Sequence, residues 1–399
     1  MDRLNRTIDV AIIGGGAAGL WLLDRLHSAG YSVALFESGT LGGNQTLAAQ
    51  GMIHGGMKYA LDGSARTDAE AVAAMPGVWR ECLSGRGPVD LRGCDVLSDR
   101  LHLWSSGALP TRLATLLAGR LLQGASRRID SQQGPGVFQH PGFRGALVEL
   151  SDFVLDPASL VRLLAQRHRE RLFAIDWRHA ALQVREGRAQ LQLPDLRLDP
   201  GCLVLAAGGG NAGLLRQLGQ ATPAMQTRPL AQVLVRSRTT PALFGHCVGT
   251  RPSPRLTVST HLRADGDYVW YLGGDLATKG VAMTDPELLQ LARAELSATL
   301  PWVDLGDAEW RVVRVDRAEP AQASGGKPDG AYLGRAGDIH NALVAWPTKL
   351  TLCPQLGDAL IETLATTTGQ APSAAADYPD ISSLGRPEIG QPPWETAFQ

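Results

Sequence analysis

A glycine-rich turn near the start of the chain restricts the possible folds more than any other feature. Residues 8–13 are apolar and mostly β-branched, residues 14–19 read GGGAAG and match the pattern GxGxxG, and residues 17–29 have a helical composition. A second strand is expected over residues 32–37, and it ends at Glu37. This order predicts a βαβ unit with parallel strands, and the terminal acid completes the fingerprint of a dinucleotide-binding domain.

The residues of this turn have different expected roles. Gly14 permits the tight turn, Gly16 lets the backbone approach a pyrophosphate, and Gly19 allows helix and strand to pack closely. Ala18 lies in the first helical turn, where unpaired N–H groups and the positive end of the helix dipole attract phosphates. Glu37 is expected to accept hydrogen bonds from ribose hydroxyl groups. The pattern therefore predicts that these five residues bind a nucleotide cofactor.

A second GxGxxG match, GGGNAG over residues 208–213, follows another apolar strand. No acidic residue lies near position 231, where a second fingerprint would place it, and the helix expected over residues 212–219 is barely two turns long. We therefore expect the strand to return to the first sheet, where Ala207 and Gly208 lie close to the same cofactor. A second nucleotide domain is the less favoured alternative.

Charge and cysteine content narrow the possible partners. The chain has 38 Lys and Arg against 39 Asp and Glu, so it lacks the basic excess that nucleic-acid binding needs. Its five cysteines are far apart and form no CxxC pair, which argues against a disulfide framework, a zinc site or an iron–sulfur cluster. No run approaches the roughly 18 apolar residues of a membrane-spanning helix. We expect a cytoplasmic protein without a metal, a nucleic-acid partner or a transmembrane segment, and peripheral membrane association stays open.

Four further stretches carry a family resemblance. They read LAAQGMIHGG over residues 47–56, VDRAEP over 315–320, KPDGAYLG over 327–334 and PTKLTL over 347–352. Together with the start of the chain they resemble the FAD-dependent D-amino-acid oxidase superfamily. The IHGG and KLT elements are similar to its glycerol-3-phosphate dehydrogenase and 2-hydroxyglutarate dehydrogenase branches. The resemblance implies FAD as the cofactor and a small acidic molecule as the substrate.

The resemblance and the strand patterns together imply an α/β fold with two domains. A discontinuous, Rossmann-like FAD-binding domain is expected over residues 1–65, 150–220 and 315–370. A substrate domain built on a mainly antiparallel sheet is expected over residues 66–149 and 221–314, because alternating apolar and polar residues there are typical of strands with one solvated face. Residues 371–399 are Pro-rich and low in periodicity, and they are expected as a surface tail.

Further cofactor-binding residues follow from the resemblance, and the Gly-, Asn-, Gln- and Thr-rich composition from about Ser38 to Met57 also suggests extended backbone that runs along a ligand. One group would run along the cofactor after the first βαβ unit: Ser38, Ala49, Gln50 and Gly51. Lys349, the N–H of Leu350 and the helix that begins at Thr351 would face the pyrimidine edge of the flavin. A cation and a helix dipole at that edge stabilise the negative charge of the reduced ring.

The resemblance also implies three catalytic residues, His54, Arg317 and Lys349. An imidazole beside the flavin can accept a hydroxyl proton while hydride leaves the adjacent carbon. The planar guanidinium of Arg317 suits a carboxylate or a phosphate and would position the reacting C–H bond over flavin N5. A structural or solvent-exposed role is the alternative for each of the three. Other polar residues of the second domain are interpreted as ordinary strand residues: Arg251, His261, Tyr268 and Tyr271.

These features favour an FAD-dependent oxidoreductase that oxidises a CH–OH bond of a small acidic metabolite, of the 2-hydroxy acid or glycerol phosphate type, by hydride transfer to flavin N5. An amine or amino-acid oxidase or dehydrogenase is the first alternative. The others are an NAD-dependent dehydrogenase that uses only the first fingerprint, and a flavin-binding protein without metabolite turnover. The sequence leaves the electron acceptor open.

Overall fold

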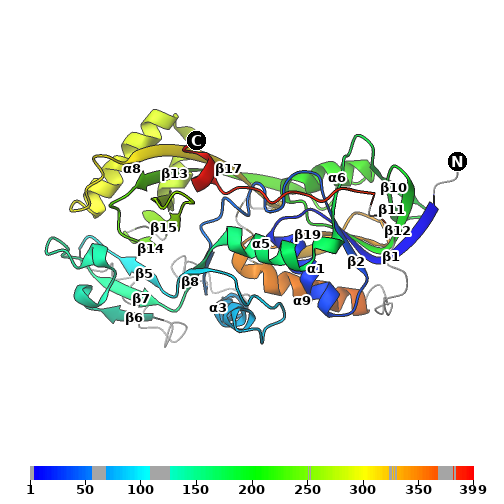
Figure 1. Cartoon of the computed structure of the whole chain (residues 1–399), viewed down its shortest axis with the longest axis horizontal. Helices are drawn as coiled ribbons and strands as arrows, with labels where there is room; N and C mark the ends of the chain where they lie inside the picture. Colours follow the sequence, from blue (N-terminus) through cyan, green and yellow to red (C-terminus); the bar gives the residue numbers. More distant parts are fainter. Residues whose placement is uncertain are drawn as a thin grey trace.

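The computed structural model describes residues 4–55, 69–107, 126–249, 251, 253–322, 326, 328, 330–366, 381 and 383–399. The molecule is elongated, with one lobe around the N-terminal strands and another around β13 to β17 (Figure 1). The chain crosses between the two lobes more than once. Among the described residues, no helix has the length and apolar character needed to cross a membrane.

The sheet of the first lobe is assembled from separate parts of the chain. Its strands are β1 (Leu4–Ile13), β2 (Val33–Glu37), β9 (Leu172–Ala174), β10 (Ala181–Arg185), β11 (Arg188–Gln192), β12 (Leu196–Leu205), β18 (Tyr332–Arg335) and β19 (Ala342–Trp346). The strand order is β10-β11-β12-β1-β2-β9, and β19 pairs with both β12 and β18. Because β1 pairs in parallel with β2 on one side and with β12 on the other, it lies in the middle of the sheet. The expected βαβ unit and the α/β class are confirmed.

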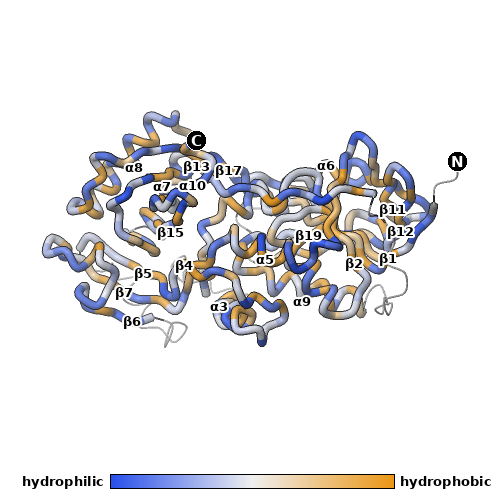
Figure 2. The backbone as a smooth tube through the Cα atoms, in the orientation of Figure 1, coloured by the Kyte–Doolittle hydropathy of each residue, from blue (hydrophilic) through white to orange (hydrophobic). Residues whose placement is uncertain are grey.

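Burial on both faces explains why β1 is apolar at successive positions. Val10 and Ile12 share a hydrophobic cluster with α1 (Ala17–Ser28), α5 (Pro157–Arg167) and α9 (Cys353–Thr366). Ala11 and Ile13 belong to a second cluster, which includes residues of α6 (Asn211–Gln217). Neighbouring side chains of a strand point to opposite faces, so a strand covered on both sides needs apolar residues throughout. Figure 2 shows the hydrophobic β1 and β2 inside this lobe.

The sheet of the second lobe is almost entirely antiparallel. Its strands are β5 (Leu101–Trp104), β6 (Ser126–Ile129), β7 (Leu147–Leu150), β13 (Met225–Ser237), β14 (Gly245–Cys247), β15 (Leu256–Leu262), β16 (Tyr268–Gly273) and β17 (Glu309–Pro320). They follow the order β17-β13-β16-β15-β14-β5-β7-β6, and β14 with β5 is the parallel pair. One face is covered by α8 (Asp285–Thr299), whose Leu288, Ala292 and Leu296 share a cluster with Val233 of β13. The expected antiparallel sheet is confirmed.

The two long strands β13 and β17 connect the lobes. They pair from Arg236 opposite Glu309 to Met225 opposite Pro320. At its far end β17 reaches the glycine turn after β12, since a Cβ placed on Gly209 would lie 3.8 Å from the Cβ of Ala318. The domain boundary expected between residues 314 and 315 therefore falls inside β17, and the boundary expected between 149 and 150 falls inside β7. Because a strand can continue from one lobe into the other, the amino-acid composition need not change at the border between the two domains.

The described part of the expected surface tail is tied to both lobes. On the first lobe, the N–H of Leu41 donates to the carbonyl of Glu388 at 2.8 Å. On the second, Trp394 of α10 (Pro393–Thr396) is 3% exposed and stacks on His261 with ring centroids 3.8 Å apart. Figure 1 shows this segment, in red, running along the molecule from the first lobe to β17. The segment is anchored by scattered residues, among them the buried Ile381 and Trp394, without any sequence periodicity, which is why the sequence does not reveal the docking.

A small third sheet lies between these parts. It is formed by β3 (Met52–Ile53), β8 (Phe153–Leu155) and β4 (Val96–Ser98), with β8 in the centre. Two further elements contact it or its neighbours, the helix α3 (Ala69–Leu83) and the 3-10 turn η7 (Leu350–Leu352). This sheet fixes the chain immediately before the stretch at residues 56–68, which lies outside the described residues.

Candidate active site

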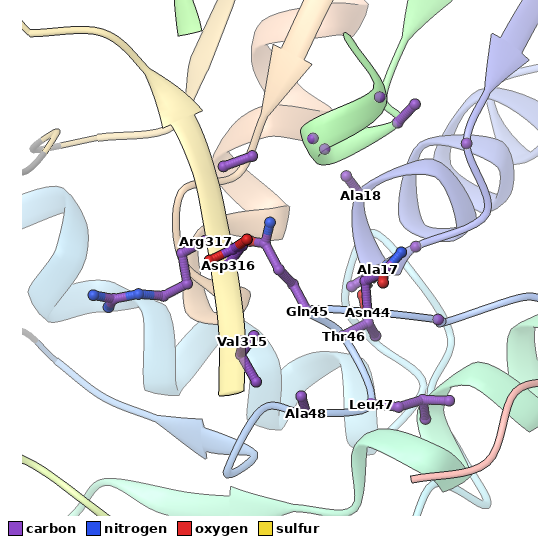
Figure 3. Close-up of a pocket in the computed structure, with 18 of the residues that line it drawn as sticks. Ala17, Ala18, Asn44, Gln45, Thr46, Leu47, Ala48, Val315, Asp316 and Arg317 are labelled. Carbon is purple, nitrogen blue, oxygen red and sulfur yellow. Dashed lines mark hydrogen bonds between the residues drawn. The ribbon is translucent and has the colours of Figure 1, made fainter. Parts of the chain in front are cut away.

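A cavity of about 1600 Å³ is lined by residues of both lobes. Its walls come from the turn after β1, the loop after β2, the turn after β12, the strand β17 and the loop after β19. Figure 3 shows Ala17, Gln45 and Asp316, from three of these stretches, around one space. Twelve of the residues predicted for the site line this cavity: Gly14, Gly16, Ala18, Glu37, Ser38, Ala49, Gln50, Ala207, Gly208, Arg317, Lys349 and Leu350. Four predicted residues do not line it: Gly19, Gly51, His54 and Thr351.

The glycine turn after β1 leaves no room for side chains at two positions. Gly14 has φ of 113°, and a Cβ there would lie 2.6 Å from the Cα of Ala207. A Cβ on Gly19 would lie 1.9 Å from the carbonyl oxygen of Gly14, so helix α1 packs directly on the turn that precedes it. Gly14 therefore brings two strands together at the cavity, whereas Gly19 acts behind the cavity wall.

Side chains of the loop after β2 hold the backbone N–H groups of this turn. The carboxylate of Glu37 accepts hydrogen bonds from the N–H of Gly15 at 2.6 Å and from the N–H of Gly39 at 2.7 Å. The hydroxyl of Thr46 accepts from the N–H of Ala17 at 2.9 Å, as an N-terminal cap would. Sequence analysis missed Thr46, and its only signal was a hydroxyl residue in a polar stretch that follows the fingerprint.

The second glycine turn belongs to the same sheet. Strand β12, which precedes it, lies between β1 and β19, and η5 (Gly208–Gly210) leads into the short helix α6. The indole of Trp346 donates to the carbonyl of Gly208 at 3.1 Å, and the side chain of Asn211 accepts from the N–H of Ala207 at 2.8 Å. The expectation that this strand returns to the first sheet is confirmed, and a separate second nucleotide domain is wrong.

The loop after β19 places Lys349 and Leu350 on the cavity wall. Thr348 adopts φ of 59° and its hydroxyl donates to the carbonyl of Gly330 at 2.9 Å, which fixes the bend before Lys349. Thr351 is fully buried behind this wall, where its hydroxyl donates to the carbonyl of His54 at 3.2 Å. Because that hydroxyl is directed to the protein backbone, Thr351 joins the loop to β3 and does not line the cavity.

His54 and Gly51 also lie behind the wall. Gly51 has φ of 73°, and a Cβ there would lie 2.0 Å from the carbonyl oxygen of Leu155, so this glycine serves close packing of the chain. After His54, the N–H of Gly55 donates to the carboxyl group of Asp152 at 2.9 Å. Burial raises the pKa of Asp152 to about 6, against the opposing effect of that hydrogen bond. The proton-acceptor role of His54 stays a prediction from sequence.

A polar network connects the cofactor loop to the second sheet. The amide Nε2 of Gln50 donates to the carbonyl of Tyr271 at 2.6 Å, and its Oε1 accepts from the hydroxyl of Thr257 at 3.0 Å. The hydroxyl of Tyr271 lies 3.0 Å from both the carbonyl of Ala48 and the side-chain oxygen of Gln232. Tyr271 is a strand residue, as expected, and it also fixes two residues of the cavity wall, Ala48 and Gln232.

The other polar residues of the second lobe do not line the cavity: Arg251, His261 and Tyr268. Tyr268 is 39% exposed at the start of β16, and Arg251 is exposed. His261 is almost fully buried, and its Nε2 lies 2.9 Å from the hydroxyl of Ser259. Their interpretation as residues outside the site agrees with these positions.

Arg317 of β17 lines the cavity and is held by the neighbouring strand. Its Nε donates to the carbonyl of Arg228, the residue opposite it on β13, at 3.3 Å. Among the described residues, its two Nη groups form no hydrogen bond or ion pair. Burial lowers the pKa of Arg317 to about 10, and the nearby positive charge of Arg228 acts in the same direction. In Figure 3, Asp316 and Arg317 leave β17 in opposite directions.

Comparison with known proteins identifies the family. The family model DAO, described as FAD dependent oxidoreductase, matches residues 9–315. The chain belongs to this family. A probable FAD-dependent oxidoreductase of Pseudomonas aeruginosa, PA4991, is 44% identical to this DAO-family chain over 393 residues, with 98% of each chain covered. The crystal structure of PA4991 matches with a TM-score of 0.86 and 39% identity, and it covers 100% of both chains.

More distant solved structures share the fold of this DAO-family protein. Glycine oxidase from Geobacillus kaustophilus has a TM-score of 0.60 at 18% identity, with 93% of this chain and 96% of that chain covered. Reduced L-α-glycerophosphate oxidase from Mycoplasma pneumoniae, with FAD bound, has a TM-score of 0.64 at 14% identity, with 92% and 99% covered. At such identities the likeness concerns the fold.

The cofactor of this DAO-family enzyme is FAD, and the residues of the cavity fit it. The Gly14 turn, Gln45 and Lys349 all line this one cavity, whose volume of about 1600 Å³ leaves room for a dinucleotide. The glycine turn gives the backbone access that a pyrophosphate needs, because a Cβ on Gly14 or on Gly15 would meet neighbouring atoms at less than 3 Å. Family membership sets aside the alternatives of an NAD-dependent dehydrogenase and of a flavin-binding protein without turnover.

Several cavity-lining stretches were not predicted. They are the loop residues Asn44 to Leu47, the strand residues Val312 to Asp316, and Gln391, Pro393, Thr396 and Ala397 near the C-terminus. The loop carried a weak signal, since its Asn, Gln and Thr residues follow the fingerprint directly. The strand carried a signal only at Val315 and Asp316, which belong to the VDRAEP stretch of the family resemblance. The other strand residues and the C-terminal residues carried none, because they reach the cavity through pairing and docking over long sequence distances.

Proposed function

We propose that this DAO-family enzyme oxidises the CH–OH bond of a small 2-hydroxy acid whose carboxylate is held by Arg317. The observation that carries the proposal is the guanidinium of Arg317. It belongs to the cavity wall, it is held by a hydrogen bond from Nε to the backbone of Arg228, and its Nη groups form no ion pair with the described residues. Such a fork is suited to bidentate contact with a carboxylate.

Each end of the cavity has a separate task in this proposal. The turn at Gly14 and the carboxylate of Glu37 bind and orient the nucleotide part of the cofactor. Bound FAD supplies a two-electron acceptor for the carbon-bound hydrogen. Lys349 presents a positive charge from the loop after β19, where it favours the negative charge that accumulates on reduction. Arg317 binds the substrate carboxylate and thereby holds the reacting C–H bond in the orientation that hydride transfer requires.

The proposal assigns proton removal to His54, on the basis of sequence. Its backbone carbonyl accepts a hydrogen bond from Thr351, one residue after the cavity-lining Leu350. A hydroxyl group needs a base when its carbon is oxidised, whereas a neutral amine already has a free electron pair. Since the side chain of His54 does not line the cavity, oxidation of an amino acid is the second candidate function.

An anaerobic substrate screen tests the proposal. The purified enzyme, with FAD bound, is mixed separately with 2-hydroxy acids, amino acids and glycerol phosphate, and the loss of visible flavin absorbance is recorded. The proposal expects rapid loss with a 2-hydroxy acid and little with the others. If only amino acids cause the loss of flavin absorbance, the second candidate function, amino-acid oxidation, replaces the first. If only glycerol phosphate causes it, the proposed specificity for a carboxylate is overturned.

A further inference from the structure

A buried ion pair lies directly beside Arg317. Arg228 is opposite Arg317 in the register of β13 and β17, and its guanidinium forms a bidentate contact with Glu319, in which Nη2 and Oε2 are 2.8 Å apart. The side chain of Glu319 is 2% exposed and that of Arg228 is 23% exposed. Gln226 also donates to Glu319, at 2.8 Å. The carboxylate is therefore fully engaged, and its main partner is the arginine next to the proposed anion site.

The three charged groups share one face of the sheet. Arg317 and Glu319 are two positions apart on β17, and a residue directly opposite on an antiparallel strand points to the same side. The positive charge of Arg228 lowers the pKa of Arg317 and the negative charge of Glu319 raises it, so the three groups interact electrostatically. Together these two arginines and one glutamate carry a single net positive charge.

Other charged groups on the cavity wall do not change this balance. Asp316 leaves β17 on the side opposite to Arg317 (Figure 3). Arg314 forms an ion pair with Asp285 at 2.7 Å. Glu37 accepts two backbone hydrogen bonds at the nucleotide end of the cavity. The positive charge of Lys349 belongs to the loop after β19, a separate part of the cavity lining.

We infer that Glu319 sets the charge selectivity of the substrate site by neutralising Arg228, so that Arg317 accepts one carboxylate and substrates with two negative charges are rejected. The inference rests on the proposed function, in which Arg317 holds the substrate. Arg228 and Glu319 do not themselves line the cavity, so they act on a bound anion from behind Arg317: Arg228 is already paired, and the carboxylate of Glu319 opposes a second negative charge at Arg317. In a poorly solvated site that repulsion is strong, and such repulsion is a common source of specificity. The substrate class is then a monocarboxylate, and dicarboxylates and phosphate dianions are disfavoured.

Binding of two matched anions tests this inference without turnover. Butyrate and succinate have the same number of carbon atoms and differ in charge. Their dissociation constants are measured by titration of the FAD-loaded enzyme, with the visible flavin absorbance as the signal. The native enzyme is expected to bind butyrate more tightly than succinate. Glu319→Gln leaves Arg228 without its carboxylate, and we expect the affinity ratio to move about tenfold toward succinate.

Further variants separate charge from folding. Arg228→Gln with Glu319→Gln removes both charges of the pair and is expected to restore the native ratio, whereas Arg228→Gln alone should weaken the binding of butyrate. Glu295→Gln is the matched control, because Glu295 is also the partly buried partner of an arginine, Arg255, and among the described residues it makes no contact with Arg228 or Arg317. A structural effect would make the double variant worse than the single one, since both partners are then lost.

The outcomes distinguish this inference from the proposed function. If Arg317→Ala leaves butyrate binding unchanged, Arg317 does not hold the substrate carboxylate, and the proposed function fails. If Arg317→Ala abolishes butyrate binding but Glu319→Gln leaves the ratio within twofold of the native value, the selectivity role of Glu319 alone is overturned. A native enzyme that prefers succinate also overturns it.

Discussion

At the nucleotide end of the cavity, the contacts come mainly from backbone groups in one short stretch of sequence, the turn at Gly14 together with Glu37 and Thr46. At the end that we propose for the substrate they come from side chains on β13, β16 and β17: Arg317 lines the cavity and Tyr271 supports its wall. The first end depends on glycines that leave the backbone bare and on two side chains that hold it, and the second depends on which side chains the strands carry. Enzymes of one fold can therefore share a cofactor and differ in substrate.

The first prediction concerns the nucleotide end and carries the largest expected effect. In Gly14→Ala the new methyl group would lie 2.6 Å from the Cα of Ala207, at a φ of 113° that disfavours alanine. Overpacking and strain together cost about 3 kcal/mol, so FAD affinity should fall about 100-fold. The measurement is the dissociation constant of FAD after its removal and titration back.

Gly77→Ala is the control for this variant. Gly77 lies in α3, and a Cβ there would meet no atom within 4 Å, so FAD affinity should stay at the native value. An unchanged FAD affinity in Gly14→Ala would show that the turn is not what limits cofactor binding.

The second prediction concerns the buried carboxyl group behind the cavity wall. The pKa of Asp152 is raised by burial from 3.8 to about 6, so the folded state binds its proton more tightly than the unfolded state does. Stability from this group is present below about pH 4 and is lost as the pH rises through about 6. Relative to Asp152→Asn, the native protein should lose roughly 3 kcal/mol between these limits.

Urea unfolding from pH 4 to pH 7 measures this difference. Asp99→Asn is the control, because Asp99 is exposed, and its curve should run parallel to that of the native protein. Parallel curves for the native protein and Asp152→Asn would contradict the assigned proton uptake.

The third prediction concerns the connection between the two ends. Tyr271→Phe removes the hydroxyl that lies 3.0 Å from Ala48 and from Gln232, and it leaves two buried acceptors without that donor. Loss of such contacts costs about 2 kcal/mol of folding free energy. Chemical denaturation measures it, and Tyr268→Phe serves as the control, since that hydroxyl is on a residue 39% exposed. Equal stability of the two variants would show that the network does not hold the lobes together.

The same contrast explains how much could be predicted from the sequence. The βαβ unit was predictable because Gly14, Gly19 and Glu37 lie within one short segment, and strand, turn and helix patterns are local. Arg317 and Lys349 came from the family resemblance, since a single arginine or lysine carries no pattern of its own. Both line the cavity.

The rest depends on contacts between residues far apart in the chain. Gln50 reaches Tyr271 across the lobes, and Trp394 docks on His261 from a segment without periodicity. The border expected between residues 314 and 315 falls inside β17, which runs from one lobe into the other. Thr351 follows the cavity-lining Leu350 in the chain, but its hydroxyl donates to the backbone carbonyl of His54. No local rule reveals such pairings before the fold is known.

The central claim is that cofactor and substrate are held by separate groups at the two ends of one cavity. The most direct measurement is a pair of dissociation constants, for FAD and for butyrate, in Arg317→Ala. We expect butyrate affinity to fall roughly thirtyfold, because a charge-assisted contact is lost, while FAD affinity stays within twofold of the native value. Unchanged butyrate affinity, or loss of FAD together with butyrate, would contradict the claim.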